Sequence, residues 1–181
     1  MVERYDIPGF VLISLLLYVG FACSSPPESS PPPAADEHIS SSSTILLTPD
    51  GRRLWLTSPD DDQLVRLDAE ELTVTARVDV PAKPSHVLRV GDRLVVSAMR
   101  STEMVVVESA EGPKVTRRIQ LPCRASRGMA AVAGGERVWV ACPFDDRVVE
   151  VDPGEGRVRR TLAAAGRPTA LAVSRGRLFV T

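Results

Sequence analysis

The 181-residue sequence contains no asparagine, only two histidines and only three cysteines. Without asparagine, glycine and aspartate must supply the tight turns that asparagine often serves. The cysteines and histidines do not show the spacing of a zinc site or of haem attachment, so we expect no metal and no cofactor. A net charge of −1 gives no global electrostatic reason to expect nucleic acid as a partner.

The sequence also lacks an apolar run that could span a bilayer comfortably as a helix. The longest such run, Phe10–Ala22, has the length of a signal-peptide core. The segment Ser24–Ser43 that follows contains five prolines and eight serines. This composition cannot bury enough apolar surface to offset chain entropy. We therefore predict a signal peptide over residues 1–22 and a disordered tether over residues 23–43.

The junction of these two segments, "GFAC", ends in Cys23 and resembles the leader of bacterial lipoproteins. The resemblance implies that Cys23 is lipidated and becomes the mature N-terminus. The protein would then be held at a membrane in the bacterial cell envelope, at the outer membrane or on the periplasmic side. An ordinary cleaved signal and a short uncleaved anchor are the alternatives.

Four similar stretches recur in the rest of the chain, and they align on arginines spaced by 40, 44 and 40 residues. The alignment begins at Arg53, Arg93, Arg137 and Arg177. The next two columns are Leu54, Leu94, Val138 and Leu178, then Trp55, Val95, Trp139 and Phe179. Each column is chemically coherent, so the chain contains an internal repeat of about 42 residues.

Each complete repeat reads as four short β-strands. Glycines separate the first two strands, at Gly51, Gly91, Gly134–Gly135 and Gly176, and glycine tolerates the positive φ of hairpin turns. This period and strand count predict an all-β fold of β-propeller blades with four antiparallel strands each. We expect the partial propeller over residues 44–181, with three blades and half of a fourth. Their approximate bounds are 44–84, 85–126, 127–168 and 169–181.

The segments "DDRVVEVD" (Asp145–Asp152) and "GRPTALAVSRGRLFVT" (Gly166–Thr181) resemble the YVTN β-propeller repeats of bacterial envelope proteins. The resemblance covers Thr44–Thr181 and supports a propeller in the cell envelope. The second repeat departs from the pattern, with Thr102 and Glu108 where aspartates are usual. Because the last hairpin lacks its own third and fourth strands, we predict that the sequence is a fragment of a longer protein.

Charged residues recur in two sets of loops that should emerge on one face of a propeller. The loops that connect one blade to the next contain Lys83, Arg124 and Arg167. The loops after the second strands contain Asp60, Asp61, Asp62, Asp145 and Asp146. These residues could form a mixed-charge surface for an unknown protein or small molecule. Alternatively, they are a solvated loop face with blade-stabilising Asx turns.

Two further cysteines, Cys123 and Cys142, flank the first two strands of the third repeat. Antiparallel pairing brings these positions together, so either a disulfide or two separate thiols is compatible with the sequence. His86 follows Ser85 directly, and strand neighbours point to opposite faces, so they cannot form a proton relay. We identify no catalytic residues.

The predicted function is a lipid-anchored cell-envelope propeller that acts as a binding or scaffold module, with no catalysis in this segment. The alternative is the N-terminal part of a larger envelope enzyme. Propellers of this kind are sometimes followed by a cytochrome-type redox domain, and related propellers include lactonases. Any catalytic part would then lie beyond residue 181.

Overall fold

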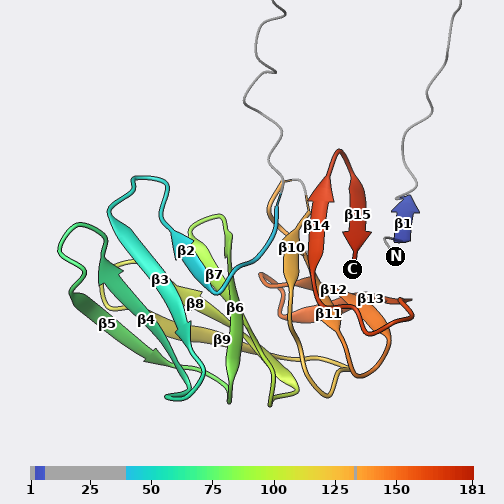
Figure 1. The fold of residues 1–181 in the computed structure, drawn as a ribbon, viewed down its shortest axis with the longest axis horizontal. Helices are drawn as coiled ribbons and strands as arrows, with labels where there is room; N and C mark the ends of the chain where they lie inside the picture. The colour runs from blue at the N-terminus through green and yellow to red at the C-terminus, as the bar shows by residue number, and fades with distance from the viewer. Residues whose placement is uncertain (1–2, 7–39, 133) are drawn as a thin grey trace, which may run out of the picture.

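A computed structural model describes residues 3–6, 40–132 and 134–181. These residues form fifteen β-strands and no helix (Figure 1). Within the described ranges there is accordingly no helix that could cross a membrane. The apolar run Phe10–Ala22, Cys23 and most of the predicted tether lie outside these ranges, so the predicted leader is not described.

Three sheets of four strands follow one another along the chain, and each is an antiparallel meander. Blade 1 contains β2 (Ile45–Leu47), β3 (Arg53–Ser58), β4 (Gln63–Asp68) and β5 (Val74–Asp79). Blade 2 contains β6 (Pro84–Val90), β7 (Arg93–Ala98), β8 (Glu103–Glu108) and β9 (Lys114–Gln120). Blade 3 contains β10 (Met129–Ala131), β11 (Val138–Cys142), β12 (Arg147–Asp152) and β13 (Arg157–Ala163). The predicted all-β fold of four-stranded propeller blades is confirmed.

A fourth sheet contains β14 (Leu171–Ser174), β15 (Arg177–Val180) and, unexpectedly, β1 (Glu3–Asp6). β1 pairs antiparallel with β15, with Glu3 opposite Val180 and Asp6 opposite Arg177. The sequence predicts a two-stranded half blade here and assigns residues 3–6 to a signal peptide. The difference has a physical reason: an open strand edge exposes unpaired backbone groups, and β1 pairs with those of β15.

The last four residues of the predicted tether are also ordered. Backbone hydrogen bonds join Ser40 to Val173, Ser42 to Met129 and Ser43 to Val87. In addition, the Ser42 hydroxyl accepts a hydrogen bond from the backbone N–H of Met129 at 2.7 Å. The segment 40–43 thus crosses the innermost strands of three sheets before it enters blade 1. These four residues therefore differ from the linker that the sequence predicts, because β14, β10 and β6 offer them backbone hydrogen-bond partners.

The core lies between neighbouring sheets. Trp55 of blade 1 shares one apolar cluster with Val87 and Leu94 of blade 2. Trp139 of blade 3 shares another with Leu171 and Leu178 of the fourth sheet. The two tryptophans occupy equivalent strand positions and are 0% and 1% exposed. Both therefore pack between sheets, as the repeat predicts.

Candidate ligand-binding face

The loops that connect the blades and the loops after the second strands lie on the same face, which we call the connecting-loop face. Backbone hydrogen bonds tie the two sets together in each blade. The N–H of Val80 donates to the carbonyl of Asp62 at 2.9 Å, and the N–H of Ala164 donates to that of Asp146 at 2.8 Å. The equivalent bond in blade 2 joins Leu121 to Thr102 at 2.8 Å.

Two of the predicted aspartates fix the backbone of two of the predicted basic residues. Oδ1 of Asp62 accepts a hydrogen bond from the N–H of Lys83 at 2.8 Å, and Oδ1 of Asp146 accepts one from the N–H of Arg167 at 3.0 Å. Lys83 and Arg167 have φ angles of 56° and 61°, a conformation that is uncommon outside glycine. These two carboxylates thus tie the loops after the second strands to the connecting loops.

Blade 2 has Thr102 at this position, and its connecting loop finds a different acceptor. The N–H of Arg124 donates to Oδ2 of Asp145 at 2.8 Å, and Nε of Arg124 lies 3.2 Å from Oδ1. The guanidinium also donates to the carbonyl of Phe144. The backbone hydrogen bond from Arg124, followed by its side chain and charge, holds the pKa of Asp145 below its usual range. Blade 2 has no aspartate to accept the N–H of its connecting loop, and Asp145 of blade 3 accepts it instead.

The same departure in blade 2 places an arginine where blade 1 has an aspartate. Arg100 is the second residue after β7, as Asp60 is after β3. Its N–H donates to the carbonyl of Ala82 at 3.1 Å, and the neighbouring Met99 N–H donates to the carbonyl of Lys83 at 2.8 Å. Arg100 therefore lies beside Lys83. Among the residues that the structure describes, neither side chain has an ion-pair partner.

A buried polar cluster lies next to these loops. The hydroxyls of Ser85 and Ser97 are 2.9 Å apart, and the Ser97 hydroxyl donates to the carbonyl of Arg127 at 2.7 Å. Ser126 accepts a hydrogen bond from the N–H of Ala98 at 3.0 Å. These bonds link the innermost strands of blade 2 to the loop that leads into blade 3.

Two polar atoms beside this cluster have no hydrogen-bond partner within the described ranges. They are Nδ1 of His86 and Nε of Arg127, and both are buried although their side chains are only partly so. Burial and then the charge of Arg127 lower the pKa of His86. The imidazole is therefore mostly neutral at pH 7 and adds no full positive charge to these loops. We call Lys83, Arg100, Arg124 and Arg127 the basic cluster.

The remaining predicted residues lie at the rim of the connecting-loop face. The Arg167 guanidinium is 5.2 Å from the centre of the Phe144 ring, a cation–π contact. Asp61 accepts a hydrogen bond from the Ser58 hydroxyl at 2.8 Å, and Asp60 is exposed. The acidic and basic residues of this face thus alternate: Asp62 binds the backbone of Lys83, Asp145 pairs with Arg124, and Asp146 binds the backbone of Arg167. The sequence patterns single out Arg124 but not Arg100 or Arg127. The departure of the second repeat at Thr102 was a signal that its loops differ from those of the other repeats.

Cys123 and Cys142 form a disulfide, with Cα atoms 5.6 Å apart. The bond links the connecting loop of blade 3 to the end of its second strand. Both residues are buried. It therefore fixes Arg124, the next residue after Cys123, relative to blade 3.

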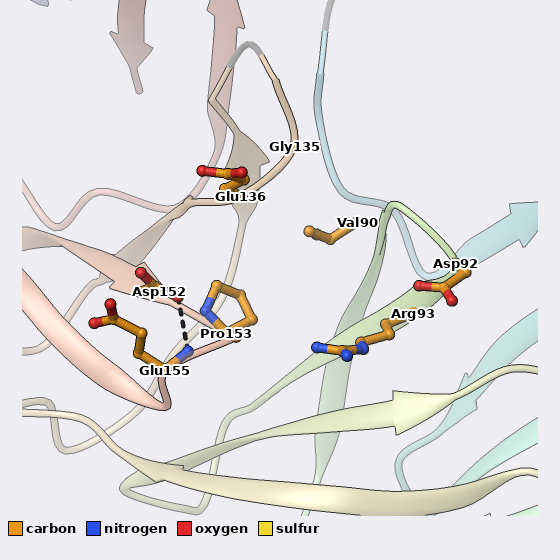
Figure 2. A pocket seen from close by; sticks show the side chains of 9 residues that line it. Val90, Asp92, Arg93, Gly135, Glu136, Asp152, Pro153 and Glu155 are labelled. Atoms are coloured by element: carbon orange, nitrogen blue, oxygen red, sulfur yellow. Dashed lines mark hydrogen bonds between the residues drawn. The ribbon is translucent and has the colours of Figure 1, made fainter.

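A cavity of about 380 Å³ lies on the opposite face, between blades 2 and 3 (Figure 2). Its lining includes Val90 and Arg93 from one hairpin, Glu136 from the next and Asp152 and Glu155 from the β12–β13 turn. Asp152 already accepts hydrogen bonds from the N–H of Glu155 at 2.8 Å and from Arg159 at 2.8 Å. Within the described ranges, no group of three or more histidine, cysteine or acidic residues is arranged to hold a metal ion.

No protein-family model matches the chain, and no curated protein is similar enough to count as a relative. Solved structures are similar in fold. Kuenenia stuttgartiensis hydrazine synthase is 21% identical over 71% of this chain and 40% of its own, with a TM-score of 0.62. The Pseudomonas aeruginosa periplasmic gluconolactonase PpgL is 21% identical over 77% of this chain and 42% of its own, with a TM-score of 0.61.

The β-propeller domain of Cps50 (Swd1) from Myceliophteria thermophila is 15% identical, with a TM-score of 0.57. This match covers 77% of the present chain and 52% of that domain. The chain thus spans about half, or less, of each of these three proteins. At such identities the likeness concerns the fold alone, and it agrees with a partial propeller.

Proposed function

We propose that this chain is a propeller module that binds an anionic partner through the basic cluster on its connecting-loop face. The observation that carries the proposal is the position of Arg100. It stands where blade 1 has Asp60, beside Lys83, and the described residues provide neither cation with a carboxylate partner.

Geometry supports a shared site for these cations. The loop from Leu121 to Arg127 runs alongside Ser97–Thr102, with hydrogen bonds from Leu121 to Thr102 and from Ser126 to Ala98. Arg100 therefore lies between two connecting loops, one that contains Lys83 and one that contains Arg124 and Arg127. Arg124 is paired with Asp145, so Lys83 and Arg100 are the cations of the cluster best placed to attract an anion. Arginine recognises carboxylates and phosphates in a bidentate manner.

Titration of the full chain with citrate, and separately with inorganic phosphate, tests the proposal by isothermal titration calorimetry. We expect the double variant Lys83→Ser/Arg100→Ser to bind at least tenfold more weakly than the unchanged protein. The matched control is Arg52→Ser/Arg93→Ser, which removes two positive charges from the hairpin turns of the opposite face. Absence of binding by the unchanged protein, or equal weakening in both double variants, would contradict the proposed site.

We further propose that the module lies at the bacterial cell envelope, anchored through lipidated Cys23. Such processing would remove residues 1–22, so the pairing of β1 with β15 would belong to the unprocessed chain alone. The leader resemblance and the Ser/Pro-rich segment after Cys23 support this location. Metabolic labelling with palmitate should label the unchanged protein and leave Cys23→Ser unlabelled. Equal labelling of the two proteins would end the lipoprotein interpretation.

A second candidate function is the front part of a larger envelope enzyme. It is favoured by the coverage of about two fifths of a periplasmic gluconolactonase and of a dihydro-heme d1 dehydrogenase, NirN. Sequencing of the DNA beyond codon 181 separates the two candidates. A CxxCH motif, or further propeller repeats that complete a ring with lactonase activity, would favour the enzyme.

A further inference from the structure

The cavity of about 380 Å³ between blades 2 and 3 is bordered by turns whose backbone is fixed by hydrogen bonds (Figure 2). On the blade 2 side, the Ser109 hydroxyl donates to the carbonyl of Asp92 in the β6–β7 turn at 2.6 Å. On the blade 3 side, Nη1 of Arg117, which belongs to β9, donates to the carbonyl of Glu155 at 3.2 Å. The walls of the cavity are therefore held in place by the protein itself.

Three charged groups that line this cavity have no ion-pair partner among the residues that the structure describes. They are the carboxylates of Asp92 and Glu136 and the guanidinium of Arg93. The other two carboxylates of the lining are engaged, since Asp152 and Glu155 lie 2.8 Å and 2.7 Å from Nη2 of Arg159. The cavity therefore combines one unpaired guanidinium with two unpaired carboxylates.

The repeat explains why Arg93 lacks a partner. Arg137, its equivalent in blade 3, lies 3.2 Å from the buried carboxylate of Glu150. The strand register places Val106 at the corresponding position of blade 2. No ion pair joins Arg93 to its cross-strand neighbour Glu108 either. Arg93 thus stays exposed and lines the cavity with its charge unmatched.

The lining also supplies apolar surface. Figure 2 shows the guanidinium of Arg93 and the side chain of Val90 extending from blade 2 towards Pro153. Glu136 lies on the blade 3 side of the cavity. A ligand held here meets a cation on one side, a carboxylate on the other and apolar side chains beside them. Small-molecule sites in proteins have volumes of about 300–1,000 Å³ and a few polar groups that fix the orientation of the ligand.

We propose that this cavity binds a free α-amino acid with an apolar side chain. The carboxylate of the ligand pairs with Arg93, its ammonium group pairs with Glu136, and its side chain packs on Val90 and Pro153. Four carboxylates line the cavity against one guanidinium, so anions such as citrate and phosphate are repelled. The site is therefore independent of the basic cluster on the connecting-loop face, and loss of Arg93 remains a valid control for that cluster.

Isothermal titration calorimetry of the full chain with leucine, leucinamide and N-acetylleucine tests the proposal. Leucinamide lacks the carboxylate and N-acetylleucine lacks the ammonium group, so each should bind at least tenfold more weakly than leucine. Arg93→Gln should bind leucine only as weakly as the unchanged protein binds leucinamide. Glu136→Gln should bind leucine only as weakly as the unchanged protein binds N-acetylleucine.

Arg52→Gln and Glu71→Gln are the matched controls, because they remove the same charges from exposed turns of blade 1. Both should bind leucine like the unchanged protein. Far-UV circular dichroism should show the same strand content in all four variants, since Arg93 and Glu136 are exposed. Three results would each overturn the proposal: no binding of leucine to the unchanged protein, an analogue that binds as tightly as leucine, or weakening in Arg93→Gln and Glu136→Gln no greater than in their controls.

Discussion

The Asp62 carboxylate holds the backbone of Lys83, with Oδ1 accepting the Lys83 N–H at 2.8 Å across 21 residues of sequence. Asp146 and Arg167 repeat this relationship at 3.0 Å, also 21 residues apart. In both pairs the donor has a positive φ angle. An aspartate after the second strand thus fixes the path of the chain into the next blade, while Lys83 and Arg167 both stay exposed.

Removal of this acceptor should destabilise the fold. Asp62→Ala leaves the Lys83 N–H without its partner in a strained conformation, so we expect the free energy of unfolding to fall by about 1 kcal/mol. Asp60→Ala is the control, because Asp60 is exposed in the same loop and should leave the free energy of unfolding nearly unchanged. Urea unfolding followed by circular dichroism measures both. Equal losses in the two variants would contradict the role of Asp62.

Glu150 should contribute more, because its carboxylate is buried between two arginines. It is 2% exposed and lies 3.2 Å from Nη1 of Arg137 and 2.7 Å from Nε of Arg160, which also covers the Trp139 ring at 4.8 Å. Glu150→Ala leaves these cations without their partner, and we expect a loss of about 2 kcal/mol in the free energy of unfolding.

Glu155→Ala provides the comparison for Glu150. It removes exposed ion pairs with Arg157 and Arg159 in the β12–β13 turn, and exposed pairs contribute little to stability. The two variants are compared by urea unfolding under the same conditions. If Glu150→Ala is no less stable than Glu155→Ala, the buried ion group does not stabilise blade 3.

The repeat period was enough to predict the strands and their packing. Alignment on Arg53 and Arg93 places Leu54 and Leu94 in one column, and the structure pairs them with Leu67 and Val107 of the neighbouring strands in the same register. The turn glycines were predictable for a related reason. Gly51, with a φ angle of 70°, occupies a hairpin turn that a side chain would strain.

Other features could not be predicted, because they depend on contacts between segments that no local pattern connects. Glu3–Asp6 has no alternation of its own and is a strand only because β15 has an open edge. Ser40–Ser43 reads as a linker until the innermost strands supply partners. Arg100 is an ordinary surface arginine in the sequence, and only the hydrogen bond to Ala82 places it beside Lys83.

His86 should make stability depend on pH. Burial and the charge of Arg127 lower its pKa in the folded protein, so the unfolded chain binds more protons below about pH 6.5. The contribution of His86 to the free energy of unfolding should therefore be fully present above about pH 6.5. It should decrease as the pH falls towards the lowered pKa. His86→Gln should remove this slope between about pH 7 and 5. The same slope in both proteins would show that His86 is not its source.

The disulfide should stabilise the third blade. Cys123 and Cys142 are separated by 19 residues in the sequence. In the chain-entropy account, a disulfide that closes a loop of this size stabilises the folded state by about 3 kcal/mol. The double variant Cys123→Ala/Cys142→Ala should lose about that much free energy of unfolding. Mass analysis without reductant, after export to an oxidising compartment, checks the bond directly. Two free thiols in the folded protein would refute it.

Residues spaced by one repeat, 40 or 44 positions, occupy equivalent sites in successive sheets, and the two tryptophans test this equivalence most directly. Trp55→Phe leaves Trp139 as the only tryptophan, and Trp139→Phe leaves Trp55. We expect both single-tryptophan proteins to emit at similar, blue-shifted wavelengths and to resist acrylamide quenching alike until they unfold, since both side chains are buried between sheets. A solvent-exposed emission from one tryptophan and a buried emission from the other would contradict the repeat.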